Sequence, residues 1–186
     1  IRSSLLTRIR VMIPIEVITM KDKQTLIYWV DLTGPAVLDE IVRLTIVDIN
    51  NNILFNHTLN TKLVDWWYSD LNGIKPEETY NEQQFEDYKQ EIQKIINKAN
   101  KLITFNSSTF FLEKQGITIP TNTVVEDLAD SFRVTGDATD TIDNLCIYYG
   151  YDLPTNIYNR TGLDYAKAIN YCWHEMERYK EAQENK

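Results

Sequence analysis

The stretch YWVDLTGPAVLDEIV, residues 28–42, decides how this chain folds. Residues 26–32 are nearly all apolar and β-favouring, which predicts a strand that is buried on both faces. Gly34 and Pro35 then mark a turn, and a second apolar run begins at Ile41. Asp31 stands where the first strand ends, a common position for a carboxylate that holds a metal ion. One carboxylate binds a divalent ion poorly, so the question is where its partners are.

The composition is that of one globular domain. Of the 186 residues, 43% are hydrophobic, which is enough for a sizeable core. The net charge of -8 argues against a broad nucleic-acid surface, because phosphate binding needs clustered Lys and Arg. Cys146 and Cys172 form neither a metal motif nor a disulfide framework, which predicts a reduced, cytoplasmic setting. No apolar run reaches about 18 residues, so we expect no membrane span.

The first 25 residues differ in character from the rest of the chain. An apolar stretch, residues 9–18, is interrupted by Pro14 and surrounded by basic side chains. This pattern predicts an extended arm or an edge strand. Two roles stay open for it: a strand that covers the domain of residues 26–186, or an arm that docks on a partner. The basic residues are Arg2, Arg8, Arg10, Lys21 and Lys23.

Strands are predicted to precede the helices. Residues 41–49 and 53–59 flank three consecutive Asn residues, which tolerate left-handed turn geometry, so we predict a hairpin. Thr79 and Glu82 fit a capping box at the start of a long helix whose apolar face runs to residue 99. We also predict a strand at 102–105 and helices at 109–115, 124–133, 139–149 and from 162 onward. This order predicts an α/β fold, a mixed sheet flanked by helices.

Five short patterns follow one another along the chain. They are Val30-Asp31-Leu32-Thr33-Gly34 with Asp39-Glu40-Ile41-Val42, then Asn72-Gly73-Ile74-Lys75-Pro76-Glu77, then Thr104-Phe105-Asn106 with Phe110-Phe111-Leu112, then Leu145-Cys146 with Gly150, then Asn159 with Asp164-Tyr165-Ala166. In this order they resemble the DEDD exonuclease superfamily, which includes the proofreading subunit of bacterial replicative polymerases and RNase T. The resemblance covers roughly residues 26–178 and implies a ribonuclease H-like fold: a mixed β-sheet flanked by α-helices.

The resemblance also implies a chemistry, which is 3′–5′ phosphodiester hydrolysis by two Mg²⁺ or Mn²⁺ ions. In such a site the two ions lie about 4 Å apart and carboxylates hold them. Asp31 matches the first of four carboxylates, but Thr33 stands where the second is expected. No Asp or Glu lies between Asn106 and Glu113, where the third is expected.

The fourth position depends on the register near the C-terminal helix. If Asn159 occupies the position of the family's general-base His, the fourth carboxylate is Asp164. A shift by one residue puts Tyr165 there and leaves no fourth carboxylate. Asn159 cannot take a proton from water as a His would. The metal ligands are thus limited to Asp31 and Asp164, which predicts weak binding of Mg²⁺ or Mn²⁺, or no cofactor at all.

Each candidate also has a structural interpretation. Asp31 can cap a turn, and Asp164 can face the dipole of its helix. Asn106 can bond turn backbone. Aromatic residues after the hairpin can cover the core or stack on bases. The candidate nucleic-acid contacts are Thr33, Asn106, Trp66 and Trp67.

We therefore expect an exonuclease-like pseudoenzyme, bacterial or viral (for instance phage) in origin, that binds a protein partner or a nucleic-acid end. The protein partner, or a second copy, would be bound through the N-terminal arm, and single-stranded nucleic acid would bind weakly. The alternative is an active metal-dependent 3′–5′ exonuclease on single-stranded DNA or RNA with an atypical ligand set. Its further carboxylates would come from Glu126, Asp127 or Asp140.

Overall fold

The computed structural model describes residues 24–132 and 141–185. The predicted N-terminal arm therefore lies outside the described residues, except for Gln24 and Thr25, which open the first strand. None of the helices in the described part of the chain is both long and apolar enough to cross a membrane.

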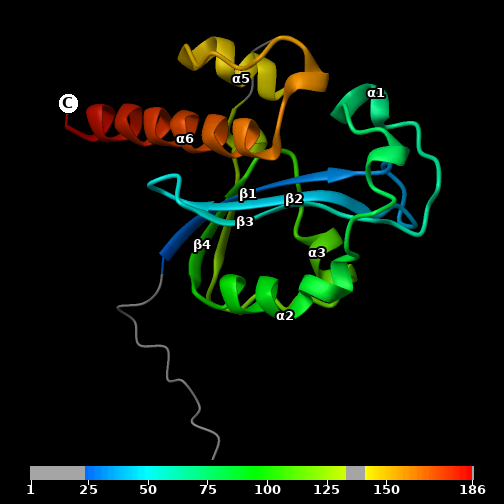
Figure 1. The fold of residues 1–186 in the computed structure, drawn as a ribbon. Coiled ribbons are helices and arrows are strands. Elements are labelled where there is room, and N and C mark those ends of the chain that lie inside the picture. The colour runs from blue at the N-terminus through cyan, green and yellow to red at the C-terminus, as the bar shows by residue number, and fades with distance from the viewer. Residues whose placement is uncertain (1–23, 133–140, 186) are drawn as a thin grey trace, which may run out of the picture.

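Five strands form one mixed sheet in the order β3-β2-β1-β4-β5 (Figure 1). β1 (Gln24–Leu32) lies at the centre and pairs antiparallel with β2 (Ile41–Asp48), which pairs antiparallel with β3 (Ile53–Thr58). On its other side β1 runs parallel to β4 (Ala99–Thr104), and β4 runs parallel to β5 (Val124–Asp127). The predicted hairpin is confirmed, and Asn51 in its turn has a φ of 62°.

Helices cover both faces of the sheet, as Figure 1 shows. α2 (Phe85–Ile96) and α3 (Phe110–Lys114) lie on one face, and α5 (Ile142–Tyr149) and α6 (Gly162–Glu184) lie on the other. The short elements are α1 (Ser69–Asn72), α4 (Leu128–Ser131) and the 3-10 turns Pro76–Glu78 and Ile157–Asn159. The predicted α/β architecture is confirmed.

β1 is apolar on both faces because each face packs against a helical layer. Leu26 and Tyr28 belong to the core that contains Ile92 of α2. Ile27 belongs to the other core, which contains Ile169 of α6. The prediction of a strand buried on both faces is therefore confirmed.

Two predicted elements have different bounds in the structure. The helix expected after Thr79 begins at Phe85, and the capping box is formed by Gln84 and Asp87. Thr79 instead ends the 3-10 turn Pro76–Glu78, where its hydroxyl donates to the carbonyl of Pro76 (2.8 Å). The Thr-x-x-Glu spacing was thus a misleading capping signal, because Thr79 lies one turn before the helix.

The helix predicted at 124–133 was wrong in its first half. Residues Val124–Asp127 form the edge strand β5, and the following helix α4 is only four residues long. Val124 and Val125 are β-branched, and tertiary pairing with β4 decides their conformation. This correction places Asp127 at the end of a parallel strand, where it pairs with Thr104 at the end of β4.

Candidate functional site

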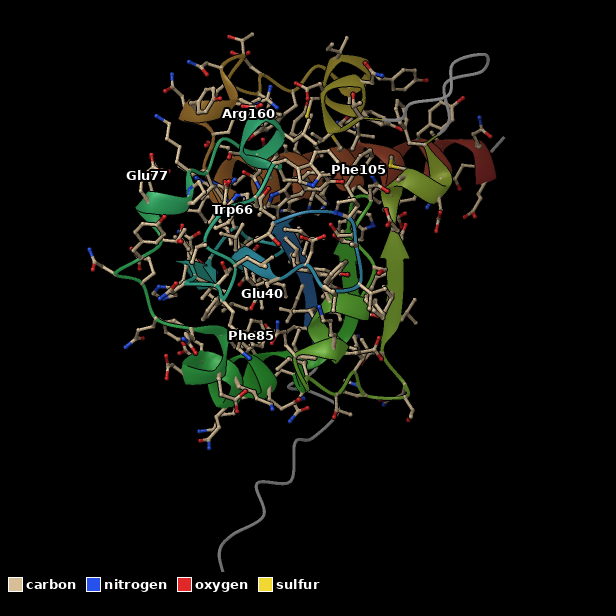
Figure 2. The ribbon with its side chains drawn as sticks, turned by 90° about the vertical axis from the view of Figure 1, so that its right-hand side faces the viewer. Glu40, Trp66, Glu77, Phe85, Phe105 and Arg160 are labelled. Carbon is tan, nitrogen blue, oxygen red and sulfur yellow. The ribbon has the colours of Figure 1, made fainter. Side chains whose placement is uncertain are left out.

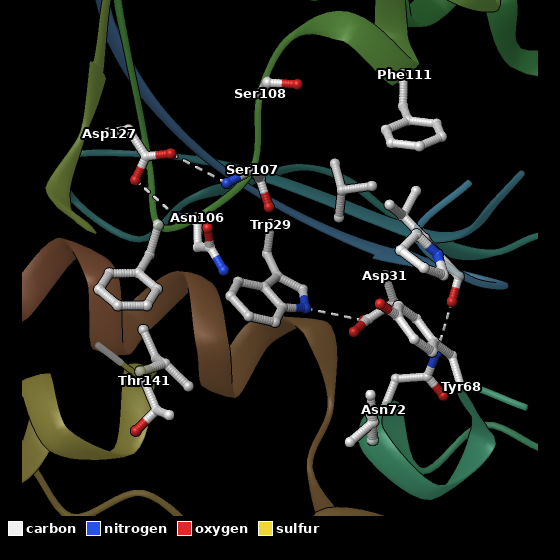
Figure 3. Close-up of a pocket in the computed structure, with 16 residues that line it drawn as sticks. Trp29, Asp31, Tyr68, Asn72, Asn106, Ser107, Ser108, Phe111, Asp127 and Thr141 are labelled. Carbon is white, nitrogen blue, oxygen red and sulfur yellow. Dashed lines mark hydrogen bonds between the residues drawn. The ribbon is translucent and has the colours of Figure 1, made fainter. Parts of the chain in front are cut away.

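A cleft with a volume of about 660 Å³ opens where β1, β4 and β5 end. The carboxyl ends of parallel strands meet at one edge of a sheet, and ligands of open α/β sheets commonly bind there. Helix α1 and the start of α5 close the cleft from the sides (Figure 3). Its lining residues are Trp29, Val30, Asp31, Leu32, Pro35, Tyr68, Leu71, Asn72, Phe105, Asn106, Ser107, Ser108, Phe111, Asp127, Thr141 and Ile142.

Asp31 lies at the floor of this cleft and is neutralised by an arginine. Its carboxylate Oδ2 is 2.6 Å from Nε of Arg43, and both side chains are about nine-tenths buried. The same oxygen accepts a hydrogen bond from the indole Nε1 of Trp29 (2.9 Å; Figure 3). Asp31 is thus committed to an internal ion pair at the position where the resemblance implies a metal ligand.

The register of the antiparallel pair explains why Arg43 is there. Asp31 on β1 lies directly opposite Arg43 on β2, and residues directly opposite point to the same face. Residues 33–40 connect the two strands. A bulge between Asp31 and Leu32 ends the regular pairing immediately after this pair. The ion pair therefore lies in the last regularly paired position before the connection.

The electrostatics of the pair follow from burial. Removal from water raises the pKa of Asp31, and the charge of Arg43 with the two hydrogen bonds opposes that shift. A buried carboxylate needs a cation or several donors nearby, and Arg43 provides both. The guanidinium is fixed in turn, because its Nη1 donates to the carbonyl oxygen of Arg160 (3.1 Å).

Tyr165 of α6 completes the floor. Its ring stacks on Trp29 with centroids 4.2 Å apart and planes 10° apart. The guanidinium carbons of Arg43 and Arg160 lie 5.8 Å and 5.7 Å from the centre of the Tyr165 ring, within the range of cation–π contacts. Burial raises the pKa of Tyr165, so its hydroxyl stays neutral near pH 7. The phenol therefore adds no negative charge to the site.

Asp164, the predicted fourth carboxylate, has a different role. Its Oδ2 accepts from the backbone N of Thr161 (2.7 Å) and from the Thr161 hydroxyl (2.8 Å), which is a capping box at the start of α6. Asn159, the predicted general-base position, is exposed in the turn before α6 and does not line the cleft. Tyr165, and not Asp164, therefore lies on the side of α6 that faces Asp31. This is the second of the two alignments considered above, in which Tyr165 occupies the fourth carboxylate position.

Thr33, which stands at the second carboxylate position, organises the loop after β1. Its buried hydroxyl donates to Oδ1 of Asp39 (2.8 Å) and accepts from the backbone N of Glu40 (3.0 Å). Both bonds are internal to residues 33–40. Thr33 does not line the cleft. A ligand in the cleft would therefore not meet this residue, which the sequence analysis named as a candidate nucleic-acid contact.

Asn106 lies at the mouth of the cleft in a left-handed backbone conformation, with a φ of 49°. Asp127 stabilises that turn, because its carboxylate accepts from the backbone N of Asn106 (2.7 Å) and of Ser107 (3.1 Å; Figure 3). Asp127 also caps α4 by accepting from the backbone N of Ala129 (3.0 Å). Both oxygens of Asp127 are therefore occupied by backbone donors.

The remaining carboxylates of the alternative ligand set do not supply a metal site. Glu126 pairs with Lys101 (2.6 Å) and, more distantly, with Lys180 (3.8 Å). Asp140 lies outside the described residues. Within residues 24–132 and 141–185, no group of three or more His, Cys, Asp or Glu side chains is arranged to hold a metal ion. The donor set at the cleft does not fit a two-ion site.

The two adjacent tryptophans separate in the structure. Trp66 is 6% exposed and packs with Val42 and Ile74, so it takes the covering role and cannot stack on a base. Trp67 is 69% exposed and meets the ring of Tyr68 edge to face at 4.8 Å. Tyr68 rather than either tryptophan lines the cleft (Figure 3).

Sequence reasoning missed the two arginines of the site. Arg43 is the one charged residue within the apolar run 41–47, and such a residue in a buried strand signals a buried partner. The second, Arg160, is held by Asp143, which its Nη1 contacts at 3.1 Å. Arg160 lies two residues before α6, and no pattern in the surrounding sequence indicated that this charge would be buried.

Comparisons with known proteins identify the fold but no sequence relative. No protein-family model matches the chain, and no curated protein sequence matches it. The catalytic unit of Neurospora crassa Pan2, with its protease and nuclease domain, is similar over 96% of this chain and 30% of its own, with a TM-score of 0.64 and 15% identity. The cell-death related nuclease CRN-4 is similar over 84% of this chain and 64% of its own, with a TM-score of 0.58 and 14% identity.

A 3′-exonuclease that recognises the 3′ end of a histone mRNA stem-loop is similar over 83% of this chain and 65% of its own (TM-score 0.60, 14% identity). The chain thus spans less than two thirds of the length of each of these structures. By their names, the first two of these structures contain nucleases and the third is a 3′-exonuclease. The chain has their ribonuclease H-like α/β fold, as its sequence motifs predict.

Proposed function

We propose that this chain is a catalytically silent exonuclease-like module that acts by binding. The ion pair between Asp31 and Arg43 carries the proposal. A two-metal hydrolase needs several carboxylates that converge on its ions and have free oxygen lone pairs. Here the first carboxylate already faces a guanidinium cation, whose charge opposes the approach of a divalent ion.

The other positions support the same conclusion. The hydroxyl of Thr33 is engaged with Asp39, and Tyr165 replaces a carboxylate on the first turn of α6. Neither Asn159 nor the adjacent Arg160 can accept a proton from an attacking water. An active exonuclease with an atypical ligand set would need free carboxylates, and Asp127 and Glu126 are engaged elsewhere.

The cleft itself is suited to neutral, planar or apolar groups. Aromatic side chains and amides line it, and none of its lining residues in the described part of the chain is Lys or Arg. A nucleic-acid end is one candidate ligand, since one structure of the yeast Pan2 module with this fold contains AAGGA RNA. Stacking gives about 1–3 kcal/mol per base, but the phosphates find no cation in the cleft, so single strands should bind weakly.

The decisive experiment compares the native chain with Asp31→Asn in a nuclease assay. Labelled single-stranded DNA and RNA are incubated with each protein in Mg²⁺ and in Mn²⁺, and products are resolved at single-nucleotide resolution. We expect no degradation above the level of the variant. Digestion by the native chain that Asp31→Asn abolishes would overturn the proposal.

A metal titration tests the same proposal without relying on activity. A ligand that binds only the native state raises the melting temperature by mass action. We expect no change at millimolar Mg²⁺ or Mn²⁺. A clear increase that Asp31→Asn removes would mean that Asp31 binds metal in spite of Arg43.

A further inference from the structure

Two segments beside the cleft, residues 34–40 and 61–72, carry five apolar side chains that are each more than 60% exposed, and one of them, Leu71, also lines the cleft. We call this set the apolar rim. Leu38 is 83% exposed, Val64 is 74% exposed and Trp67 is 69% exposed, and the other two members are similarly open. Exposed apolar residues gathered in this way mark interaction sites on soluble proteins. The rim consists of Val37, Leu38, Val64, Trp67 and Leu71.

The two segments are fixed beside each other. The carboxylate of Glu40 accepts from the backbone N of Lys62 (2.9 Å) and of Leu63 (3.0 Å). At the other end, the amide of Asn72 donates to the carbonyl of Leu32 (2.9 Å). Figure 2 looks onto this end of the sheet, with Glu40 and the buried Trp66 on adjoining parts of it. The two segments that carry the rim are therefore held side by side.

The charge around the rim is negative. Residues 61–82 contain five exposed carboxylates and two lysines, which gives a net charge of -3 for this segment. Such a surface repels a phosphodiester chain and attracts a cationic partner. The exposed carboxylates are Asp65, Asp70, Glu77, Glu78 and Glu82.

The sequence contains a segment of matching chemistry. Residues 1–23 have five basic side chains against Glu16 and Asp22, a net charge of +3, and an apolar centre at residues 9–18. We propose that residues 1–23 of a second copy of this chain dock on the apolar rim, with their Arg and Lys side chains toward its carboxylates. This proposal rests on the proposed function, since it assigns a partner to a module that acts by binding.

The position of β1 favours a second copy over the same chain. β1 begins at Gln24, and the rim lies at its opposite end, beyond Leu32 (Figure 1). Nine residues of strand span about 30 Å, so a chain's own segment would have to run back along the sheet before reaching the rim. An exchange between two copies avoids this and makes two equivalent contacts per dimer.

Self-association of the full chain tests the docking surface. Light scattering after size-exclusion chromatography, over a dilution series, should show a concentration-dependent dimer. Leu38→Asp and Trp67→Ala should each raise the dissociation constant by about tenfold or more, because exposed aromatic and apolar anchors dominate such interfaces. Ile147→Asp is the matched control: Ile147 is 78% exposed on α5, outside the rim, and its substitution should leave the dimer unchanged.

A charge exchange tests the identity of the docking segment. One variant carries Asp65→Lys and Asp70→Lys, and the other carries Arg8→Glu and Arg10→Glu. Each should self-associate weakly, and a mixture of the two should form a heterodimer. A native chain that stays monomeric at all concentrations, or a mixture that stays monomeric, would overturn the proposal. Nuclease activity in the separate assay would refute the proposed function and would not alter the dimer, so the two failures are distinguishable.

Discussion

The floor of the cleft and the apolar rim beside it differ in whether their side chains have partners within the chain. At the floor, Asp31, Arg43, Trp29 and Tyr165 contact one another, and the carboxylate has its cation within the chain. At the rim, Trp67 and its apolar neighbours face solvent with most of their surface. The two charges at the floor are thus paired within the chain, although Nη2 of Arg43 is buried without a hydrogen-bond partner, while the apolar side chains of the rim stay exposed. The difference is what the proposed function requires: an occupied first carboxylate at the floor and exposed surface for a partner beside it.

The first prediction concerns substitutions in the ion pair at the floor of the cleft. Asp31→Asn or Arg43→Met leaves one buried charge without its partner, so each should lower the free energy of unfolding by about 3–5 kcal/mol. Chemical denaturation followed by circular dichroism measures the loss.

The control is the double variant, Asp31→Asn with Arg43→Met, which removes both charges. It should cost clearly less than the sum of the single variants, because no unpaired charge remains. Additive costs would show that the two side chains do not stabilise each other, and would weaken the view of the floor as a closed ion pair.

Much of this architecture could be predicted from the sequence. The apolar run ending at Asp31, the Asn turn of the hairpin and the glycine that closes α3 are local signals, and local signals decide those elements. The loss of carboxylates at Thr33 and after Asn106 is likewise visible in the sequence. The fold follows from these residues, and the degenerate character of the site stays a prediction.

The arrangement of the floor depended on register, which local patterns do not determine. Arg43 pairs with Asp31 next to a bulge, and only the paired strands show that geometry. A shift of one residue on α6 turns Asp164 into a cap and brings Tyr165 to the floor. β5 was mistaken for a helix because its partner, β4, is distant in the sequence and supplies the pairing.

The second prediction concerns how the free energy of unfolding depends on pH. Burial raises the pKa of Tyr28, whose hydroxyl beneath the cleft donates to the carbonyl of Ser107 (2.8 Å). The unfolded phenol ionises first, so this contribution to stability is complete below pH of about 10 and is lost as pH rises further. Tyr28→Phe should reduce the alkaline slope of the free energy of unfolding by up to about 1.4 kcal/mol per pH unit.

Denaturation between neutral and alkaline pH measures that slope. An unchanged slope in Tyr28→Phe would mean that the unfolded and folded chains ionise this phenol alike, contrary to its burial.

The last prediction concerns the rim and has the smallest expected effect. Trp67→Ala should change the free energy of unfolding by less than about 0.5 kcal/mol, because an exposed side chain loses little packing on folding. The adjacent buried residue is an internal standard: Trp66→Ala should cost about 3–5 kcal/mol. Denaturation is measured at low protein concentration, so that self-association does not contribute. A large loss in Trp67→Ala would show that the rim supports the fold, and its exposed apolar surface would then no longer indicate a binding site.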